Sequence, residues 1–297
     1  MIPIRPAARL LMCAPEHFAV SYAINPWMDP ADWARERGVH AQAAQQQWRA
    51  LYRTLAQRGA AIDLVRPAPG VPDLVFTANA AVVLDRKALL ARFRHPQRQR
   101  EEPHFAAAFE RLKARGLIER IERLPAGMVL EGAGDCVWDG TRQLFWLGYG
   151  QRSDALARRA VMDTFGRQVV ALQLADPRFY HMDTALCPLP RGELMYYPCA
   201  FTANGLATIR GLVPADKRIE IGPEDAGTLA ANAVAIGDTL IMAGASERLR
   251  ATLAERGYEV AVTPLGAFLR SGGAAFCLTL RLDRQSAPVS ATARHAA

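Results

Sequence analysis

Cys277 is the side chain of this sequence best suited to act as a nucleophile. It follows the pair Gly272-Gly273 and lies in a run, 275–281, that is expected to form a buried strand. Glycine lets the backbone turn tightly and approach a ligand closely, and a strand would hold the sulfur on a rigid element. Taken alone, the residue also fits a structural cysteine, because free cysteine is among the most buried residue types.

Two further segments favour chemistry at this thiol. His181-Met182-Asp183 supplies a base with an acid two residues on, and the two side chains would share one face of a strand. The glycine turn Glu131-Gly132-Ala133-Gly134-Asp135 supplies further carboxylates. A nucleophile, a base and an orienting acid are the parts that covalent catalysis requires, so the sequence predicts a cysteine-dependent enzyme.

The composition indicates a folded protein with a core of its own. Of the 297 residues, 51% are hydrophobic and 22% are charged. No apolar run approaches the roughly 18 residues of a membrane span, and residues 8–13 are expected to be a first strand rather than part of a signal segment. Five cysteines are an odd number without close pairing, so we expect a reducing, cytoplasmic compartment. The sequence contains no C-x-x-C, and we expect neither a metal site nor a cofactor.

The net charge of +7 raises the question of a nucleic-acid partner. The positive charge is almost all arginine, because lysine occurs only at Lys87, Lys113 and Lys217. The densest cluster, 92–100, runs directly into Glu101-Glu102 and offers no series of aromatic residues on which bases could stack. We therefore expect neither a nucleic acid nor a membrane as partner.

The elements follow a rhythm of two short strands, a helix and another strand, which differs from the simple alternation of a doubly wound sheet. Helices are expected at 30–58, 101–115, 153–165 (with Ser153 as N-cap) and 246–257. Strands are expected at 8–13, 61–65, 75–84, 88–93, 128–131, 136–138, 144–147, 168–172, 184–189, 193–197, 232–236, 239–242, 259–263 and 275–281. No linker interrupts this series, so we predict a single domain, 1–283. Residues 284–297 lack apolar periodicity and are expected to be a disordered tail.

Five separated segments together resemble one enzyme superfamily. They are 72–80 (PDLVFTANA), 130–135 (LEGAGD), 148–153 (GYGQRS), 179–184 (FYHMDT) and 272–278 (GGAAFCL). Their order and spacing resemble the guanidino-group-modifying enzymes: arginine deiminases, dimethylarginine dimethylaminohydrolases, arginine dihydrolases and amidinotransferases. The resemblance covers 12–282. It implies an α/β fold, namely the five-bladed α/β propeller (pentein) of ββαβ modules around a central active site.

In that family the late cysteine is the nucleophile, which falls on Cys277. The resemblance implies that its thiolate attacks the guanidinium carbon and forms a covalent thioester-like intermediate. His181 would protonate the leaving amine and then deprotonate water. Glu131 matches the acid that contacts guanidinium and histidine, and Asp183 matches a second carboxylate. A guanidinium needs acceptors on both edges because it carries five N–H donors in a fixed fork.

The resemblance also assigns residues to the rest of the substrate. Arg98 and Arg152 match the arginines that grip the substrate α-carboxylate, although each also fits an ordinary surface charge. Asp135 is expected among the substrate-binding residues as well. The turn that carries it is one residue longer than in many relatives, so Asp135 also fits a residue that holds backbone amides.

Asn79 departs from many deiminases and dimethylarginine hydrolases, which have an acid at this place. Segment 76–80, which includes Phe76, and segment 24–28, which includes Asn25, look more like the arginine dihydrolase branch. There the ureido product is hydrolysed a second time. An amide can donate to a ureido oxygen and a carboxylate cannot. We therefore expect a cysteine-dependent hydrolase of arginine or an arginine derivative, similar to an arginine dihydrolase or deiminase, with Asn25, Phe76 and Asn79 among the substrate-binding residues.

Three other functions stay open. A dimethylarginine dimethylaminohydrolase would release citrulline and a methylamine, and an amidinotransferase would hand the amidino group to an amine. A non-catalytic propeller, such as the ribosome anti-association factors, is the third. Cys277, His181 and Glu131 together argue against the last, because a scaffold needs none of them. The expected partner is a small guanidino substrate, and a homo-oligomer is possible.

Overall fold

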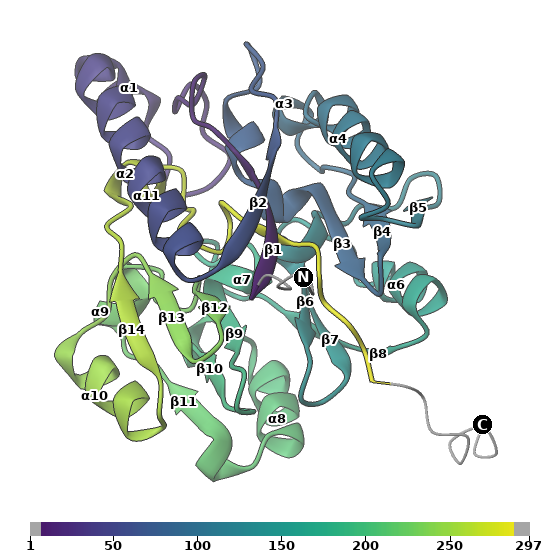
Figure 1. The fold of residues 1–297 in the computed structure, drawn as a ribbon. Helices are drawn as coiled ribbons and strands as arrows, with labels where there is room; N and C mark the ends of the chain where they lie inside the picture. Colours follow the sequence, from purple (N-terminus) through teal and green to yellow (C-terminus); the bar gives the residue numbers. More distant parts are fainter. Residues whose placement is uncertain (1–6, 288–297) are drawn as a thin grey trace, which may run out of the picture.

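Five three-stranded sheets form the α/β fold that the computed structural model describes for residues 7–287 (Figure 1). The sheet orders are β15-β1-β2, β3-β4-β5, β6-β7-β8, β11-β10-β9 and β12-β13-β14. The strands are β1 Ala8–Cys13, β2 Ala60–Val65, β3 Ala81–Leu84, β4 Lys87–Leu90, β5 Arg120–Arg123, β6 Cys136–Asp139, β7 Leu144–Tyr149, β8 Gln168–Gln173, β9 Leu186–Pro188, β10 Leu194–Tyr196, β11 Arg218–Glu220, β12 Val234–Ile236, β13 Thr239–Met242, β14 Glu259–Val262 and β15 Leu280–Arg281.

Each sheet has the same pattern of connections. The central strand pairs antiparallel with one neighbour and parallel with the other, as β7 does with β6 and β8. A helix joins each parallel pair, as parallel neighbours require. These helices are α2 Arg37–Gln57, α4 Glu102–Ala114, α6 Ala157–Phe165, α8 Ala203–Leu212 and α10 Glu247–Glu255. Figure 1 shows all five at the periphery. The two ends of the chain share one sheet, because β15 pairs with β1 through Leu10 and Arg281.

The predicted elements differ from the structure in several places. The helix expected at 30–58 is divided into α1 Pro30–Arg35 and α2, because Glu36 leaves helical geometry with φ −131°. The helix expected from Ser153 begins only at Ala157. Helix α8 and strands β5 and β11 were not predicted. Further short helices are α3 Pro96–Gln99, α9 Pro223–Gly227 and α11 Gly266–Leu269, and 3-10 turns are η1 Pro72–Val75, η2 Thr77–Ala80, η3 Pro198–Ala200 and η4 Ala215–Lys217.

In every sheet, a short turn precedes the strand that pairs antiparallel with the central strand. The turns are η2 before β3, α5 (Gly132–Asp135) before β6, α7 (Met182–Ala185) before β9, residues 228–231 before β12, and residues 275–278 before β15. Helix α5 packs against both η2 and α7. The fold therefore collects side chains from distant parts of the sequence at these turns.

The strand predicted at 275–281 is wrong for most of its length. Leu278 N donates to Ala274 O at 3.2 Å and Thr279 N donates to Phe276 O at 2.9 Å, so Cys277 lies in a helical turn. Likewise, 75–84 is strand only from Ala81, and 128–131 contributes only an isolated bridge at Leu130. Short buried apolar runs look alike in strands and in buried turns, which explains the three errors.

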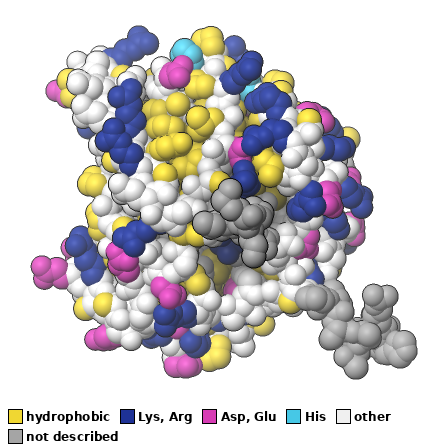
Figure 2. Space-filling model, in the orientation of Figure 1, with side chains coloured by type: hydrophobic (Ala, Val, Ile, Leu, Met, Phe, Trp, Pro, Cys, Tyr) yellow, Lys and Arg dark blue, Asp and Glu magenta, His cyan; other side chains and the backbone are white. Residues whose placement is uncertain are grey.

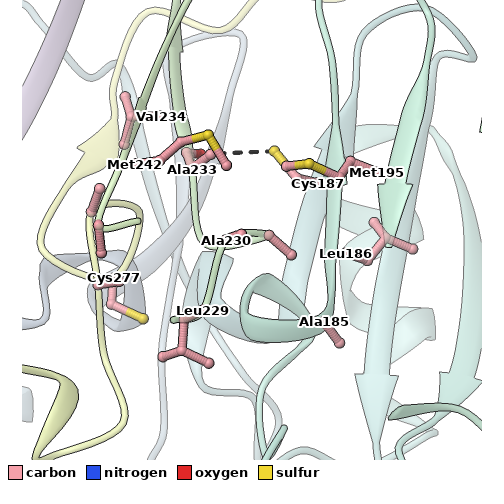
Figure 3. Packing of buried hydrophobic residues seen from close by; sticks show 14 of the residues in the cluster. Ala185, Leu186, Cys187, Met195, Leu229, Ala230, Ala233, Val234, Met242 and Cys277 are labelled. Carbon is pink, nitrogen blue, oxygen red and sulfur yellow. Dashed lines mark hydrogen bonds between the residues drawn. The ribbon is translucent and has the colours of Figure 1, made fainter. Parts of the chain in front are cut away.

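Cys187 of β9 faces the segment that leads into β12. Figure 3 shows its sulfur directed at Ala233, and the sulfur lies 3.8 Å from the Ala233 carbonyl oxygen. On the surface, the Lys and Arg side chains of the face in Figure 2 are interspersed with Asp and Glu, and hydrophobic side chains gather between α2 and α4. No helix among the described residues is long and apolar enough to cross a membrane.

The predicted tail begins with residues that contact the domain. Ser286 donates from its backbone N and its Oγ to the Asp85 carboxylate, at 2.7 and 2.6 Å. The remainder of that prediction, 288–297, lies outside the described residues.

Candidate active site

A small polar pocket lies beside the turn that carries Cys277. Its volume is about 10 Å³, which is room for roughly one water molecule. It is lined by Ile24, Asn25, Asp73, Phe76, Asn79, Arg98, Arg152, Tyr180, Ser271 and Cys277. A second cavity of about 50 Å³ is lined mainly by apolar side chains, and no predicted site residue lines it. The chemistry therefore belongs to the polar pocket.

Cys277 lies between a carboxylate and an amide. Its Sγ donates to Asp183 Oδ2 at 3.2 Å and accepts from Asn232 Nδ2 at 3.1 Å. The side chain is 2% exposed. Burial, and next the charge of Asp183, raise the pKa of this thiol well above its ordinary value. The resting sulfur is therefore a thiol, and a nearby positive charge would favour its ionisation.

Asp183 holds a buried oxygen that has no partner. Its Oδ2 contacts Cys277, while Oδ1 is buried and lacks a hydrogen bond within the described residues. Burial raises the pKa of Asp183 to about 7, although hydrogen bonds from Cys277 and Asn232 oppose the shift. Buried polar atoms are nearly always hydrogen-bonded, so an orphaned acceptor beside a nucleophile indicates a place for a donor.

His181 pairs with Glu131, and Glu131 also holds Arg152. His181 Nε2 lies 2.7 Å from Glu131 Oε2, and Arg152 Nη1 donates to the same oxygen at 3.1 Å. Burial lowers the pKa of His181 to about 4 in spite of Glu131. Although burial opposes it, Arg152 and His181 hold the pKa of Glu131 far below its usual range. A carboxylate can only accept, so the proton of the neutral ring is on Nε2, and Nδ1 is its basic nitrogen.

His181 and Asp183 do not share a strand face, contrary to the prediction. His181 is the N-cap of α7 and Asp183 lies within that helical turn. Residues two apart in a helical turn point in different directions. The two side chains consequently serve different partners: His181 contacts Glu131, and Asp183 contacts Cys277.

Both predicted arginines are buried at the pocket, so the alternative of a surface charge is wrong. Arg152 donates to Glu131 and, through Nη2, to Ile24 O at 3.1 Å, and its guanidinium lies 4.5 Å from the centre of the Tyr180 ring. These two hydrogen bonds leave three of its five N–H donors for another partner.

Arg98 has less to offer a ligand. Its Nε and Nη2 donate to Glu101 at 2.9 and 2.8 Å, Nη1 donates to Asn79 Oδ1 at 2.9 Å, and Nη2 also reaches Asp73 O at 3.4 Å. One N–H remains after these four bonds. Burial alone would lower the pKa of Arg98, but Glu101 holds it well above the ordinary value.

Asn79 and Asn25 both line the pocket while bonded to backbone. Asn79 Nδ2 donates to Glu131 O at 3.2 Å. A Cβ at Gly134 would collide with this amide, which is why the turn before β6 needs a glycine there. Asn25 Nδ2 donates to Ser271 O at 3.1 Å. The ring of Phe76 forms part of the pocket wall, and a Cβ at Gly273 would collide with it.

Asp135 takes the second of the two roles considered for it, that of a residue that holds a backbone amide. Its Oδ2 accepts from Ser153 Oγ at 2.6 Å and its Oδ1 accepts from Met182 N at 3.1 Å. It does not line the pocket. Asp135 therefore supports the turn behind His181 instead of facing a substrate. The Ser153 hydroxyl donates to Asp135 and accepts from Glu131 N at 2.9 Å. It therefore does not cap the helix for which it was predicted.

Three residues of this region were not predicted from the sequence. Asn232 contacts the sulfur, and Tyr180 carries the face on which Arg152 lies. Asp73 lines the pocket and accepts from Tyr22 Oη at 2.8 Å through Oδ2, while its buried Oδ1 has no hydrogen-bond partner among residues 7–287. Asp73 and Tyr180 stand inside two of the five segments that resemble the superfamily, so they could have been considered. Nothing in the sequence marked Asn232.

Among residues 7–287, no group of three or more His, Cys, Asp or Glu side chains is arranged to hold a metal ion. The chemistry that the described side chains can carry out is nucleophilic attack by sulfur, with proton transfer at His181 and carboxylates that receive a cation.

Comparisons with known proteins found relatives that cover all the residues of this site. The family model for "N,N dimethylarginine dimethylhydrolase, eukaryotic" matches residues 14–282. The bifunctional arginine dihydrolase/ornithine cyclodeaminase ArgZ of Synechocystis is 44% identical over 94% of this chain, which spans 38% of the length of that relative. A dimethylarginine dimethylaminohydrolase of Mycobacterium tuberculosis is 37% identical over 92% of this chain and 85% of its own. The crystal structure of the ArgZ N-terminal domain with bound substrate superposes with a TM-score of 0.87, at 43% identity, covering 94% of this chain and 99% of that chain.

Proposed function

Because the chain belongs to the N,N-dimethylarginine dimethylhydrolase family, we propose that it is a cysteine-dependent hydrolase of the arginine guanidinium group, acting as an arginine dihydrolase. One observation carries the proposal. Cys277 Sγ lies 3.2 Å from Asp183 Oδ2, and Asp183 Oδ1 is a buried acceptor without a partner in the part of the chain that the structure describes. A planar cation with N–H donors along its edge satisfies that oxygen and places its carbon beside the sulfur.

In the first half-reaction the positive guanidinium favours the Cys277 thiolate, and the thiol proton passes to His181. Sulfur attacks the guanidinium carbon, so an S–C bond forms. The C–N bond to a terminal nitrogen then breaks, and ammonia leaves with the proton from His181. Glu131 stabilises the imidazolium, since the two side chains are 2.7 Å apart. His181 next takes a proton from water, whose oxygen attacks the same carbon. The S–C bond breaks and citrulline forms.

A dihydrolase repeats the cycle on the ureido group. A second attack and hydrolysis releases ammonia again, and the carbamate left on nitrogen decomposes to carbon dioxide and ornithine. Overall, one arginine and two waters give ornithine, two ammonia and one carbon dioxide. The substrate is neutral in this second round, so its oxygen needs a hydrogen-bond donor. Asn79 lines the pocket and has an N–H beyond the one that it gives to Glu131 O.

The product series tests the proposal, and Asn79→Asp tests its second step. Wild-type protein with arginine is expected to accumulate ornithine, with citrulline only transient. Asn79→Asp is expected to slow citrulline hydrolysis roughly 5- to 150-fold, because a buried acceptor facing the ureido oxygen costs ~1–3 kcal/mol. Mass spectrometry of citrulline and ornithine over time measures both rates.

The Asn79 experiment needs a control because the variant also loses its bond to Glu131 O. Asn25→Asp is the matched control. Asn25 also lines the pocket, and its amide also donates to a backbone oxygen, that of Ser271. We expect Asn25→Asp to leave the ornithine-to-citrulline ratio unchanged. Stoichiometric release of citrulline by wild type would refute the dihydrolase proposal while leaving guanidinium hydrolysis intact.

The polar groups that line the pocket also suit the α-amino-acid end of arginine. Asp73 Oδ1 is a buried acceptor that no described residue contacts by a hydrogen bond, which suits an ammonium group, and Arg152 has donors left for a carboxylate. Both residues line the pocket.

Arg152→Lys is therefore expected to lower kcat/KM for arginine roughly tenfold or more. The kcat/KM for agmatine, which has no carboxylate, should change much less. Lysine keeps the charge beside Glu131 but loses the bidentate fork. Steady-state kinetics with the two substrates measure the ratio. Equal losses for arginine and agmatine would show that Arg152 acts only through Glu131.

Hydrolysis of dimethylarginine is the second candidate. The chain spans 38% of the ArgZ relative but 85% of the mycobacterial dimethylarginine dimethylaminohydrolase. In that case wild type would prefer dimethylarginine and release dimethylamine, which the same mass spectrometry detects.

We propose further that the five sheets are the blades of a five-bladed propeller formed by a single domain, 1–283. The repeated ββαβ topology and the sheet shared by both chain ends support this arrangement. A reducing, cytoplasmic location is consistent with five free cysteines among the described residues. A small guanidino substrate is the partner proposed, with a homo-oligomer as the assembly to be tested.

A further inference from the structure

Asn232 directly follows residues 228–231, the one turn among the five to which no function has been assigned. The turn before β3 carries Asn79, that before β6 follows Glu131, that before β9 carries Asp183, and that before β15 carries Cys277. Asn232 directly follows the turn before β12 and is fully buried. Its place in the fold is therefore equivalent to that of the proposed site residues.

The Asn232 amide holds the nucleophile on two sides. Nδ2 donates to Cys277 Sγ at 3.1 Å and to Asp183 O at 3.2 Å, and Oδ1 accepts from Cys277 N at 3.1 Å. The backbone oxygen of Asn232 also accepts from Phe276 N at 3.2 Å. The amide thus uses both N–H donors and its oxygen. One of these donors points at the reacting atom.

The other groups near the sulfur include opposing charges. Asp183 contacts it directly and disfavours the thiolate. The pocket beside Cys277 is also lined by Tyr180, Asp73, Arg98 and Arg152. Arg152 donates to Glu131, which in turn contacts His181. Asn232 contributes a neutral side-chain donor that stays fixed whatever the ionisation of these groups, because its oxygen is anchored on Cys277 N.

We propose that Asn232 is a catalytic residue: its amide N–H stabilises the Cys277 thiolate, and its amide oxygen fixes the turn that presents the sulfur. The inference deepens the proposed function, from which it takes only the assignment of Cys277 as nucleophile. A hydrogen bond to an ionised group is shorter and stronger than one to a neutral group, so the bond becomes more favourable when the thiol ionises.

The test measures the thiol directly, without substrate. In a Cys199→Ser background, which removes the exposed cysteine, Cys277 alkylation by iodoacetamide is followed by mass spectrometry from pH 6 to 10. Asn232→Ala is expected to move the profile about one pH unit upward, which lowers the rate at pH 7 about tenfold. Asn232→Asp keeps the size and the acceptor for Cys277 N, but it loses the donor. It should slow alkylation at least as much.

Thr279→Val is the matched control. Thr279 Oγ1 donates to Ala275 O and Phe276 O in the same turn and does not contact the sulfur. Its alkylation profile should superimpose on that of the parent. An Asn232→Asp profile equal to the parent's, or an equal shift in Thr279→Val, would overturn the proposal. If the parent hydrolyses no guanidino compound, the proposed function fails, but these profiles still decide the role of Asn232.

Discussion

Cys277→Ser is expected to lower kcat on arginine by at least roughly a thousandfold, because removal of a nucleophile costs several orders of magnitude in enzymes that form covalent intermediates. A serine hydroxyl is far less acidic than a thiol, so the groups that accept the thiol proton would leave the serine almost entirely un-ionised. The variant should fold, since Oγ can donate to Asp183 and accept from Asn232 as Sγ does. Initial-rate assays and thermal unfolding measure the two effects.

The matched control is Cys199→Ser, which makes the same change at an exposed cysteine in η3. It should retain full activity. Mass spectrometry of quenched wild type should show an adduct on the peptide that contains Cys277, and the variant should lack it. A Cys277→Ser protein that retains more than about a thousandth of wild-type kcat would contradict the covalent mechanism. So would activity that a chelator abolishes and zinc restores.

How far the sequence predicts this site depends on how local each feature is. Cys277, His181, Glu131 and Asp183 were selected from residue type and spacing, and the fold brings them to adjacent turns. Their backbone setting was predicted wrongly. Cys277 and His181 were expected on strands, because a buried apolar turn and a buried strand have the same hydrophobic pattern.

Contacts between side chains that are far apart in the sequence could not be predicted from local sequence patterns. Asn232 meets Cys277 from 45 residues away, and nothing near it in the sequence indicates the contact. The ion pair of Arg98 with Glu101 is close in sequence, yet the charged cluster around these residues gave no sign that the two side chains pair and are buried. Burial decides its role, and burial depends on how α3 and η1 pack. The two roles considered for Asp135 could not be distinguished for the same reason, because only the packing of α5 against α7 shows that its carboxylate accepts from Met182 N.

The buried Arg98–Glu101 pair determines the main effect expected from mutating Arg98. The two side chains are 4% and 0% exposed, and two hydrogen bonds join them. Burial keeps the pKa of Glu101 above its ordinary value even beside Arg98. Loss of Arg98 would leave a buried carboxylate without its counter-ion, and breaking such a pair typically costs about 3–5 kcal/mol. The family resemblance, taken alone, implies that mutating Arg98 would mainly weaken substrate binding.

Arg98→Ala is therefore expected to destabilise the protein by about 3–5 kcal/mol, whereas Arg191→Ala should cost about 0–1 kcal/mol. Arg191 makes a similar two-bond pair with Asp238, but both partners are about half exposed. Urea unfolding measures both free energies. Without Arg98, the pKa of Glu101 in the folded state rises further above that in the unfolded state. The folded state then binds more protons, so the loss should be larger at pH 8 than at pH 5.

The double variant Arg98→Met with Glu101→Leu separates stability from substrate binding. Replacing both members of a buried pair by apolar groups is often nearly neutral, so most of the lost stability should return. The activity of this stable variant then shows whether the enzyme needs the one N–H of Arg98 that bonds to no other described group in the wild type. If the stable double variant hydrolyses agmatine normally but arginine poorly, Arg98 binds the carboxylate. If both substrates are affected alike, Arg98 acts by orienting Asn79, to which it donates at 2.9 Å. An Arg98→Ala protein as stable as wild type would contradict the account of the buried pair.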